Sequence, residues 1–282
     1  MAFTITVHSL RGGTGKTLVS MNLAAHLVKL GNRVFIIDMD LGAPSLQTYV
    51  KTLPEKTIND YFSDGESLDR IFFDATELAG TNISGKLYMA LANFKGSFIS
   101  KLAETDKQKS MDELYKLINL VKEILPRDPW NADFIILDTS PGFSKDSLNC
   151  VAAADHLIIM LRLVNADLGG TGEMLKTLHM ALKPETSLVL NQVPQTFVDD
   201  DAESYTRELI KKHIIDPVGS EKIKIAGFIT NDIDVLDLEG EFAMYYLEGV
   251  EAKRPVHIVI NPNGRLSKHI EEIASYVIEL KE

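Results

Sequence analysis

The stretch Leu10-Arg11-Gly12-Gly13-Thr14-Gly15-Lys16-Thr17 lies between an apolar run, Phe3 to Val7, and a segment of helical periodicity, Leu18 to Leu30. A strand, a glycine-rich turn and a Lys-Thr pair that opens a helix form the context in which a phosphate-binding P-loop occurs. The glycines let the backbone curl and direct successive N–H groups at one anion, and the positive end of the helix adds to that site. The stretch therefore predicts a nucleotide-phosphate site.

The residues of this loop divide into backbone and side-chain contributors to the site. Lys16 can place a positive charge on the β- and γ-phosphates, and the Thr17 hydroxyl can bind Mg²⁺. The general P-loop pattern has a glycine where this chain has Leu10, so the strict pattern fails at its first position. A plain glycine turn is the alternative, but it leaves the Lys-Thr pair unexplained. The predicted nucleotide contacts are Gly12, Gly13, Thr14, Gly15, Lys16, Thr17 and Leu18.

The loop resembles the deviant Walker A motif, KGGxGK[ST], of the ParA/MinD family of ATPases. In that family a signature lysine at the first motif position reaches across a nucleotide-sandwich dimer to the phosphates of the partner. Arg11 stands at the matching position. Arginine keeps the charge and adds a planar fork that suits phosphate oxygens, but it is not interchangeable with lysine. The resemblance implies ATP and Mg²⁺ as cofactors, a homodimer in the ATP state, and a catalytic role for Arg11 across that dimer.

The pattern along the 282 residues predicts an α/β fold: a single domain, 1–282, with a doubly wound, mostly parallel sheet and helices on both faces. Near-continuous apolar runs, typical of parallel strands buried on both faces, alternate with helical periodicity and without a break in composition. The runs are 3–7, 33–38, 87–91, 134–137, 157–161, 188–190 and 223–229, with 257–260 as a candidate last strand. The helical segments are 18–30, 111–125, 144–154, 172–182, 202–215, 235–246 and 266–280.

Acidic residues follow two of the apolar runs. Ligands in such sheets bind beyond the carboxyl ends of the strands, and Asp138 stands at the Walker B position, where a carboxylate holds Mg²⁺ directly or through water. Gly142, after Pro141, offers a bare N–H suited to sensing a γ-phosphate. In the family, the pair matching Asp38 and Asp40 forms switch I, which implies that Asp40 orients the attacking water and that Asp38 supports Mg²⁺ or the P-loop lysine. The alternative is that both acids only form a turn.

Two polar loops are candidates for base recognition. Asn191 ends an apolar run, and an amide side chain offers both a donor and an acceptor to the edge of a purine. The family has an asparagine at this place beside the adenine and a second contact loop after the next strand, which here is Thr230-Asn231-Asp232. Relatives commonly have a proline where this chain has Thr230. We predict that Asn191, Asn231 and Asp232 line the base site.

The net charge and the cysteine content limit which partners and which cellular compartment are expected. The formal net charge of −11 disfavours bulk attraction to DNA or to anionic lipid, which leaves direct DNA binding open only through a local basic patch. Pairs such as Lys253-Arg254 are flanked by acids and are interpreted as solvated. Segment 266–280 has an acidic polar face, so we expect it to pack on the sheet instead of anchoring to a membrane. With one cysteine, Cys150, and no room for a signal peptide before Phe3, we expect a cytoplasmic protein.

Four functions are consistent with these patterns. The first is a nucleotide-switched ATPase of the ParA/MinD type, slow and partner-stimulated, which positions DNA or a protein complex through an activator or cargo adaptor. The second is a phosphotransferase or ligase on the same P-loop. The third is a metal-delivery ATPase, which the lone Cys150 disfavours. The fourth is a nucleotide-binding scaffold with negligible hydrolysis.

Overall fold

A central sheet organises the chain in the computed structural model, which describes residues 1–93, 107–199 and 201–282. The described residues form eight strands in the order β3-β4-β2-β5-β1-β6-β7-β8. Every neighbouring pair is parallel except the antiparallel pair of β3 with β4. The strands are β1 (Phe3–His8), β2 (Arg33–Met39), β3 (Phe73–Asp74), β4 (Lys86–Ala90), β5 (Phe134–Thr139), β6 (His156–Arg162), β7 (Thr186–Val193) and β8 (Ile223–Thr230). The predicted doubly wound, mostly parallel α/β fold is confirmed.

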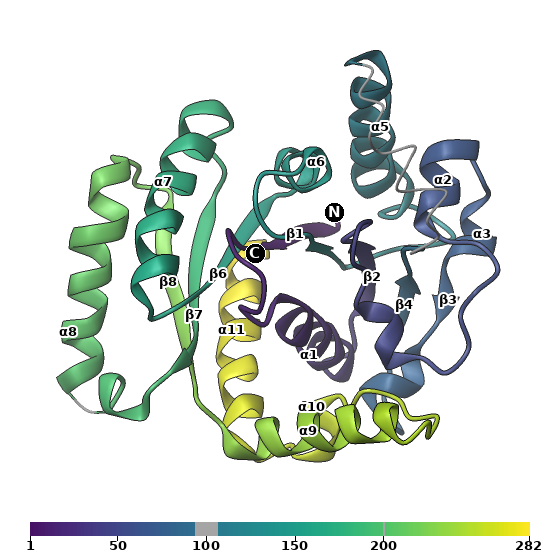
Figure 1. Cartoon of the computed structure of the whole chain (residues 1–282). Helices are drawn as coiled ribbons and strands as arrows, with labels where there is room; N and C mark the ends of the chain where they lie inside the picture. Colours follow the sequence, from purple (N-terminus) through teal and green to yellow (C-terminus); the bar gives the residue numbers. More distant parts are fainter. Residues whose placement is uncertain (94–106, 200) are drawn as a thin grey trace.

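Helices cover both faces of this sheet (Figure 1). On one face, α1 and α11 share a core with α10, while α2, α3, α5 and α6, then α7 and α8, form two further clusters on the other face. Because β1, β2 and β5 are buried between these layers, nearly all of their positions are inaccessible to solvent. The helices are α1 (Lys16–Lys29), α2 (Ile58–Asp64), α3 (Leu68–Ile71), α5 (Lys107–Asn119), α6 (Lys145–Ala153), α7 (Asn165–Ala181), α8 (Asp201–Ile210), α9 (Ile233–Leu247), α10 (His257–Ile260) and α11 (Arg265–Lys281).

Local sequence explains the end of α1 and the packing of α11. Helix α1 ends at Lys29, and Gly31 then adopts a φ of 93°, the left-handed conformation that commonly ends a helix. Helix α11 packs against α1 and β8 as predicted: Leu266, Ile270, Ile273, Ala274 and Val277 of its apolar stripe are buried, whereas Glu271, Glu272 and Glu279 are exposed. No helix in the described part of the chain is long and apolar enough to cross a membrane.

The prediction of a last strand at His257 to Ile260 was wrong, because these residues form the short helix α10. So short a segment, with three apolar residues after a histidine, cannot be assigned to strand or helix by periodicity. The backbone of α10 forms hydrogen bonds with side chains of α1 and, among the described residues, not with a neighbouring strand. The Ile258 N–H donates to Asn22 Oδ1 at 3.0 Å, and Lys29 Nζ donates to the Ile258 carbonyl at 2.6 Å.

The start of the helix predicted from Gly172 was also wrong, because α7 begins at Asn165. Glycines at 169, 170 and 172 disfavour a helix on propensity alone. At Gly170, however, a Cβ would lie 2.3 Å from Leu10 Cδ2, so this glycine lets α7 pack closely on the loop after β1. Tertiary packing therefore overrides the local preference.

Candidate functional site

The candidate site lies at the carboxyl end of β1, where the strand order reverses. Strand β1 pairs with β5 on one side and with β6 on the other. The strands before β6 lie on the first side, and β7 and β8 lie on the second. In doubly wound sheets the crevice at this point is the usual ligand site. The loop from Ser9 to Gly15 leaves β1 here and leads into α1 (Figure 1).

The glycines of this loop shape an open backbone cradle. Gly13 and Gly15 have φ angles of 74° and 89°, which L side chains rarely adopt. Gly15 is also the N-cap of α1 and supplies no side-chain hydrogen bond, so the first N–H groups of the helix lack a side-chain cap. A Cβ on Gly12 would meet nothing within 4 Å. The buried Thr14 hydroxyl has no hydrogen-bond partner among the residues that the structure describes. Uncapped donors around an open space fit a phosphate chain.

Lys16 is held inside this cradle. Its side chain is 8% exposed, and Nζ donates to Ser9 Oγ at 3.1 Å. Ser9 Oγ in turn donates to the Arg11 carbonyl at 2.6 Å, so the ammonium is tethered to the loop. Burial lowers the pKa of Lys16, and the nearby carboxylates of Asp138 and Asp40 oppose that shift. The ammonium group is therefore oriented by one hydrogen bond and keeps donors for an anionic ligand.

Two carboxylates lie side by side beneath the loop. Asp38 on β2 and Asp138 on β5 are direct register partners, 0% and 1% exposed. Ser20 Oγ donates to Asp138 Oδ1 at 3.0 Å, and the N–H groups of Asp40 and Leu46 donate to Asp38. Burial raises the pKa of Asp138 to about 6, and burial together with the charge of Asp138 raises the pKa of Asp38. Two buried like charges are unfavourable in isolation and suit a divalent cation between protein and ligand oxygens.

The Thr17 hydroxyl points toward the same region as these carboxylates. It shares a hydrogen bond of 2.7 Å with Ser45 Oγ, and Ser45 belongs to the loop that follows Asp40. It also lowers the pKa of Asp138 by hydrogen bonding. The structure therefore brings all three predicted metal ligands, Thr17, Asp38 and Asp138, to one place. A hydroxyl and carboxylates are the oxygen donors that Mg²⁺ prefers.

The two loops with predicted switch roles both contact the P-loop region. Asp40 is half-buried, its carboxylate accepts from the Ala43 N–H at 3.0 Å, and burial raises its pKa. Gly142 adopts a φ of 80°, and its N–H donates to the Ser9 carbonyl at 2.9 Å. The Gly142 N–H is thus already engaged by the P-loop, and a bound γ-phosphate would have to compete for it.

Arg11 does not point into its own cradle. Its side chain is 53% exposed, and Nε donates to the Ala166 carbonyl at 3.2 Å and lies 3.7 Å from Asp167 Oδ1. Asp167 is 2% exposed and lies at the start of α7. Its carboxylate also receives a forked pair of hydrogen bonds from Arg162, at 2.8 and 3.2 Å. Asp167 therefore holds two arginines at the mouth of the site.

Arg162 is a site residue that the sequence analysis missed. It ends β6, and its guanidinium lies 4.0 Å from where a Cβ on Gly13 would be. The available signal was its place at the carboxyl end of a predicted strand, as for Asp138. It adds a further cation to Lys16 and Arg11 at the glycine loop, and a guanidinium suits phosphate oxygens.

The predicted base contacts line one cavity beside α1, of about 180 Å³. Asn191 is 4% exposed, and its Nδ2 donates to the Thr14 carbonyl at 2.8 Å, while its Oδ1 accepts from the Gln192 N–H. Asp232 caps α9 and also accepts from the Leu266 N–H at 3.2 Å. Asn191 and Asp232 thus also stabilise the loops. The cavity is lined by Leu18, Asn191, Gln192, Ile229, Thr230, Asn231, Asp232, Val235, Leu236 and Leu266.

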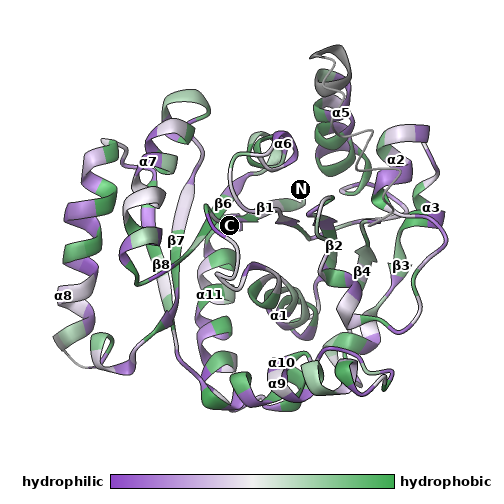
Figure 2. Ribbon diagram, viewed as in Figure 1, coloured by the Kyte–Doolittle hydropathy of each residue, from purple (hydrophilic) through white to green (hydrophobic). Residues whose placement is uncertain are grey.

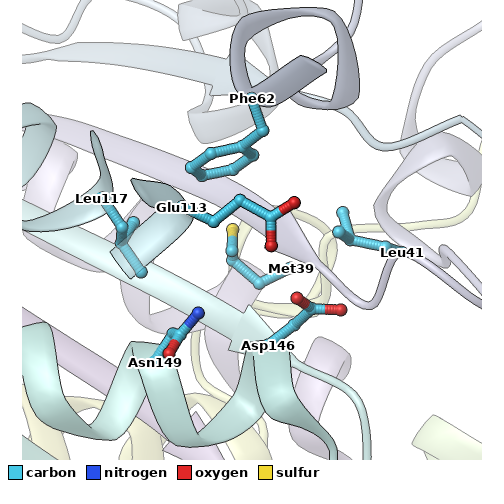
Figure 3. Close-up of a pocket in the computed structure, with 7 residues that line it drawn as sticks. All are labelled: Met39, Leu41, Phe62, Glu113, Leu117, Asp146 and Asn149. Carbon is cyan, nitrogen blue, oxygen red and sulfur yellow. The ribbon is translucent and has the colours of Figure 1, made fainter. Parts of the chain in front are cut away.

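A separate small pocket, with a cavity volume of about 20 Å³, lies behind the loop of Asp40 (Figure 3). Met39, Leu41, Phe62 and Leu117 supply apolar walls, and the carboxylates of Glu113 and Asp146 approach the same space. Burial raises the pKa of Asp146, whereas Glu113 is paired with Lys145. None of the predicted nucleotide contacts lines this pocket.

The basic pair Lys253-Arg254 was predicted to be solvated, and for Arg254 this was wrong. Its side chain is 19% exposed. The guanidinium lies over the Tyr49 ring, 5.2 Å from the centroid, and Nε donates to both oxygens of Glu239 at 3.0 Å. Arg254 therefore fastens α9 to the body of the protein and is not part of a basic surface patch.

Known proteins resemble this chain in sequence and in fold. A family model described as an AAA domain matches residues 2–189. An ATP-binding protein of Methanocaldococcus jannaschii is 27% identical over 191 residues, which are 67% of this chain and 62% of that protein. The sporulation initiation inhibitor Soj of Bacillus subtilis is 25% identical over 224 residues, 75% of this chain and 83% of Soj.

A solved structure with the same fold is also similar to this chain. The septum site-determining protein MinD of Pyrococcus horikoshii, in complex with Mg-ADP, superposes with a TM-score of 0.70 at 19% identity, over 99% of this chain and 97% of that one. At this identity the likeness shows the fold alone. This chain spans less than two thirds of the length of the Methanocaldococcus protein.

Proposed function

This chain belongs to the ParA/MinD type of P-loop ATPases within the AAA-domain family, and on that premise we propose that it is an ATP-hydrolysing switch that dimerises around ATP and Mg²⁺. The observation that carries the proposal is the grouping of Lys16 with the carboxylates of Asp40 and Asp138 at the glycine loop, with Asp38 beside Asp138. Phosphoryl transfer requires charge neutralisation, positioning and one acceptor to orient water, and these groups supply all three.

Nucleotide binding follows from the loop. The backbone of residues 12–15 and the start of α1 would surround the α- and β-phosphates, and Lys16 would bind the β- and γ-phosphates. Thr17 and Asp138 would hold Mg²⁺, which neutralises charge on the phosphate oxygens. Asp38 would support the metal site indirectly. Its carboxylate accepts hydrogen bonds from the N–H groups of Asp40 and Leu46 and so fixes the loop between them. The cavity beside Leu18 would take the base.

Hydrolysis would use Asp40. Its carboxylate accepts hydrogen bonds from the backbone N–H groups of Ala43 and Gly42, and its remaining lone pairs would orient a water molecule toward the γ-phosphorus. The γ-phosphate would also draw the Gly142 N–H away from the Ser9 carbonyl. Cleavage removes that attraction and lets the loop relax, which is the order–disorder logic of nucleotide switches.

Arg11 would act across a two-fold dimer. Its guanidinium is turned away from its own cradle toward α7 and is half exposed, so a second copy can reach it. Two-fold symmetry gives each subunit one arginine and one site, so each site would be completed by the partner. A guanidinium adds charge-assisted hydrogen bonds to phosphate oxygens. The ATP-bound dimer would then recruit an activator or cargo adaptor in the cytoplasm.

Phosphate release separates this proposal from its alternatives. Purified protein with ATP and Mg²⁺ should release inorganic phosphate slowly, Lys16→Ala should release none, and Asp40→Ala should bind ATP but release phosphate at least about tenfold more slowly. A parent that binds ATP without releasing phosphate would support a scaffold. Transfer of the γ-phosphate to an acceptor other than water would support a phosphotransferase. Asp40→Ala at the parent rate would place the water-orienting acid elsewhere.

A further inference from the structure

Helix α9, together with the turn that follows it, exposes several large apolar side chains. None of its residues from Ile233 to Leu247 is buried. Tyr246 is 81% exposed and Leu247 75%. Figure 2 shows hydrophobic residues on α9 at the periphery of the molecule. We call this surface the α9 patch; its large apolar members are Ile233, Leu236, Met244, Tyr245, Tyr246, Leu247 and Val250.

The α9 patch is also strongly acidic. Residues 233–252 include six carboxylates and no lysine, arginine or histidine. Of these acids, Glu239 is paired with Arg254 and His257, and Asp234 accepts from Asn261. The other four carboxylates make no ion pair or hydrogen bond within the described ranges. They are Asp237, Glu241, Glu248 and Glu251, and all four are exposed.

We propose that the α9 patch is the docking surface for a basic amphipathic helix of a partner protein. Contiguous exposed apolar side chains mark interaction surfaces, and unpaired acids around them select the opposite charge. A second copy in two-fold contact would oppose acid to acid, which is repulsive. An anionic membrane is repelled for the same reason, since membrane-surface helices carry lysine and arginine beside their apolar face.

The location of the patch joins it to the nucleotide site. Leu236 is 61% exposed and also lines the cavity assigned to the base, next to Asn231 and Asp232. Asp232 is the N-cap of α9. A partner helix that covers Leu236 therefore closes the outer wall of that cavity. The inference deepens the proposed function, because it gives the chemistry and the docking site of the adaptor.

Binding of a designed peptide tests the proposal without nucleotide, so that its failure can be distinguished from failure of the ATPase assignment. The probe is a fluorescent helical peptide with leucines on one face and lysines beside them. Two controls replace its lysines by glutamate or scramble its order. The parent should bind the lysine peptide, and the double variant Tyr246→Ser/Leu247→Ser should bind it at least about tenfold more weakly. Met180→Ser on α7, where the side chain is 84% exposed, should bind as the parent does.

Charge reversal supplies the stricter test. Asp237→Lys/Glu241→Lys should lose the lysine peptide and gain the glutamate peptide, whereas Glu271→Lys/Glu279→Lys on α11 should not. Equal binding of the scrambled peptide, or no effect of the α9 variants, would overturn the proposal. So would self-association of the parent that Tyr246→Ser/Leu247→Ser abolishes, or binding to vesicles of anionic lipid, because each would give the patch another occupant.

Discussion

Replacing Asp138 by asparagine should stabilise the nucleotide-free protein while abolishing its response to Mg²⁺ with ATP. Burial raises the pKa of Asp138 from 3.8 to about 6. The folded state therefore binds a proton on Asp138 more tightly than the unfolded chain does. This preference contributes fully to the free energy of unfolding below pH 3.8, and the contribution is lost as the pH rises through 6. At neutral pH the ionised carboxylate costs the folded state about 3 kcal/mol, at about 1.36 kcal/mol for each pKa unit.

Asparagine removes this charge and keeps an oxygen that can accept from Ser20 Oγ. We expect Asp138→Asn to raise the free energy of unfolding by about 1–3 kcal/mol at pH 7.5, and by about half as much at pH 5. The measurement is urea unfolding in a chelator at both pH values. Asp237→Asn, which changes an exposed acid without a partner, is the matched control and should change little.

The same variant should lose the ligand effect. A ligand that binds only the folded state raises stability by mass action, so Mg²⁺ with ATP should raise the unfolding midpoint of the parent. Asp138→Asn should show a much smaller rise. A variant that is no more stable than the parent at pH 7.5, or that gains equally at both pH values, would refute the reasoning from buried charge.

Three further outcomes follow from the structure. Lys16→Ala should abolish heat of ATP binding in calorimetry, and ATP binding equal to that of the parent would contradict the P-loop assignment. Gly15→Ala should destabilise by more than about 1 kcal/mol in urea, because its Cβ would lie 2.2 Å from Asn191 Nδ2 at a φ of 89°, whereas Ala at the open helical position Gly240 should stabilise by up to about 1 kcal/mol. Burial lowers the pKa of His8 and of His156 to about 4, so both imidazoles are neutral in the folded protein and their contribution to the free energy of unfolding is fully present above pH 6.5. As the pH falls toward 4, the free energy of unfolding should decrease by up to about 3 kcal/mol for each histidine. His156→Gln should weaken that pH dependence, and an unchanged pH profile would contradict the prediction.

Sequence alone predicted the parts of the site that depend on local pattern. Lys16 and Thr17 follow a glycine loop between a strand and a helix, and Asp38 and Asp138 end apolar runs, so the parallel arrangement brings them to one edge. Such signals need no knowledge of distant contacts. Asn191 was also predicted at this edge, though its hydrogen bond to the Thr14 carbonyl was not.

The rest depends on tertiary contacts that no local pattern encodes. Asp167 in the first turn of a helix is ordinarily explained by the helix dipole, but here it is buried and holds Arg11 and Arg162. The early start of α7 depends on Leu10 packing against Gly170. Segment 235–246 has the periodicity of a helix with one buried face, whereas α9 buries no residue. Its exposure becomes apparent only once the other helices have occupied the sheet.

The mass of the protein with ATP and Mg²⁺ tests the central claim, a dimer closed by ATP through Arg11. Light scattering is measured on an Asp40→Ala background, where hydrolysis should not release the dimer. We predict twice the chain mass of 31.3 kDa with ATP, the chain mass with ADP, and the chain mass with ATP when Arg11→Ala is added, while Arg11→Lys keeps the dimer. A monomer at saturating ATP, or a dimer that is indifferent to Arg11→Ala, would contradict the account.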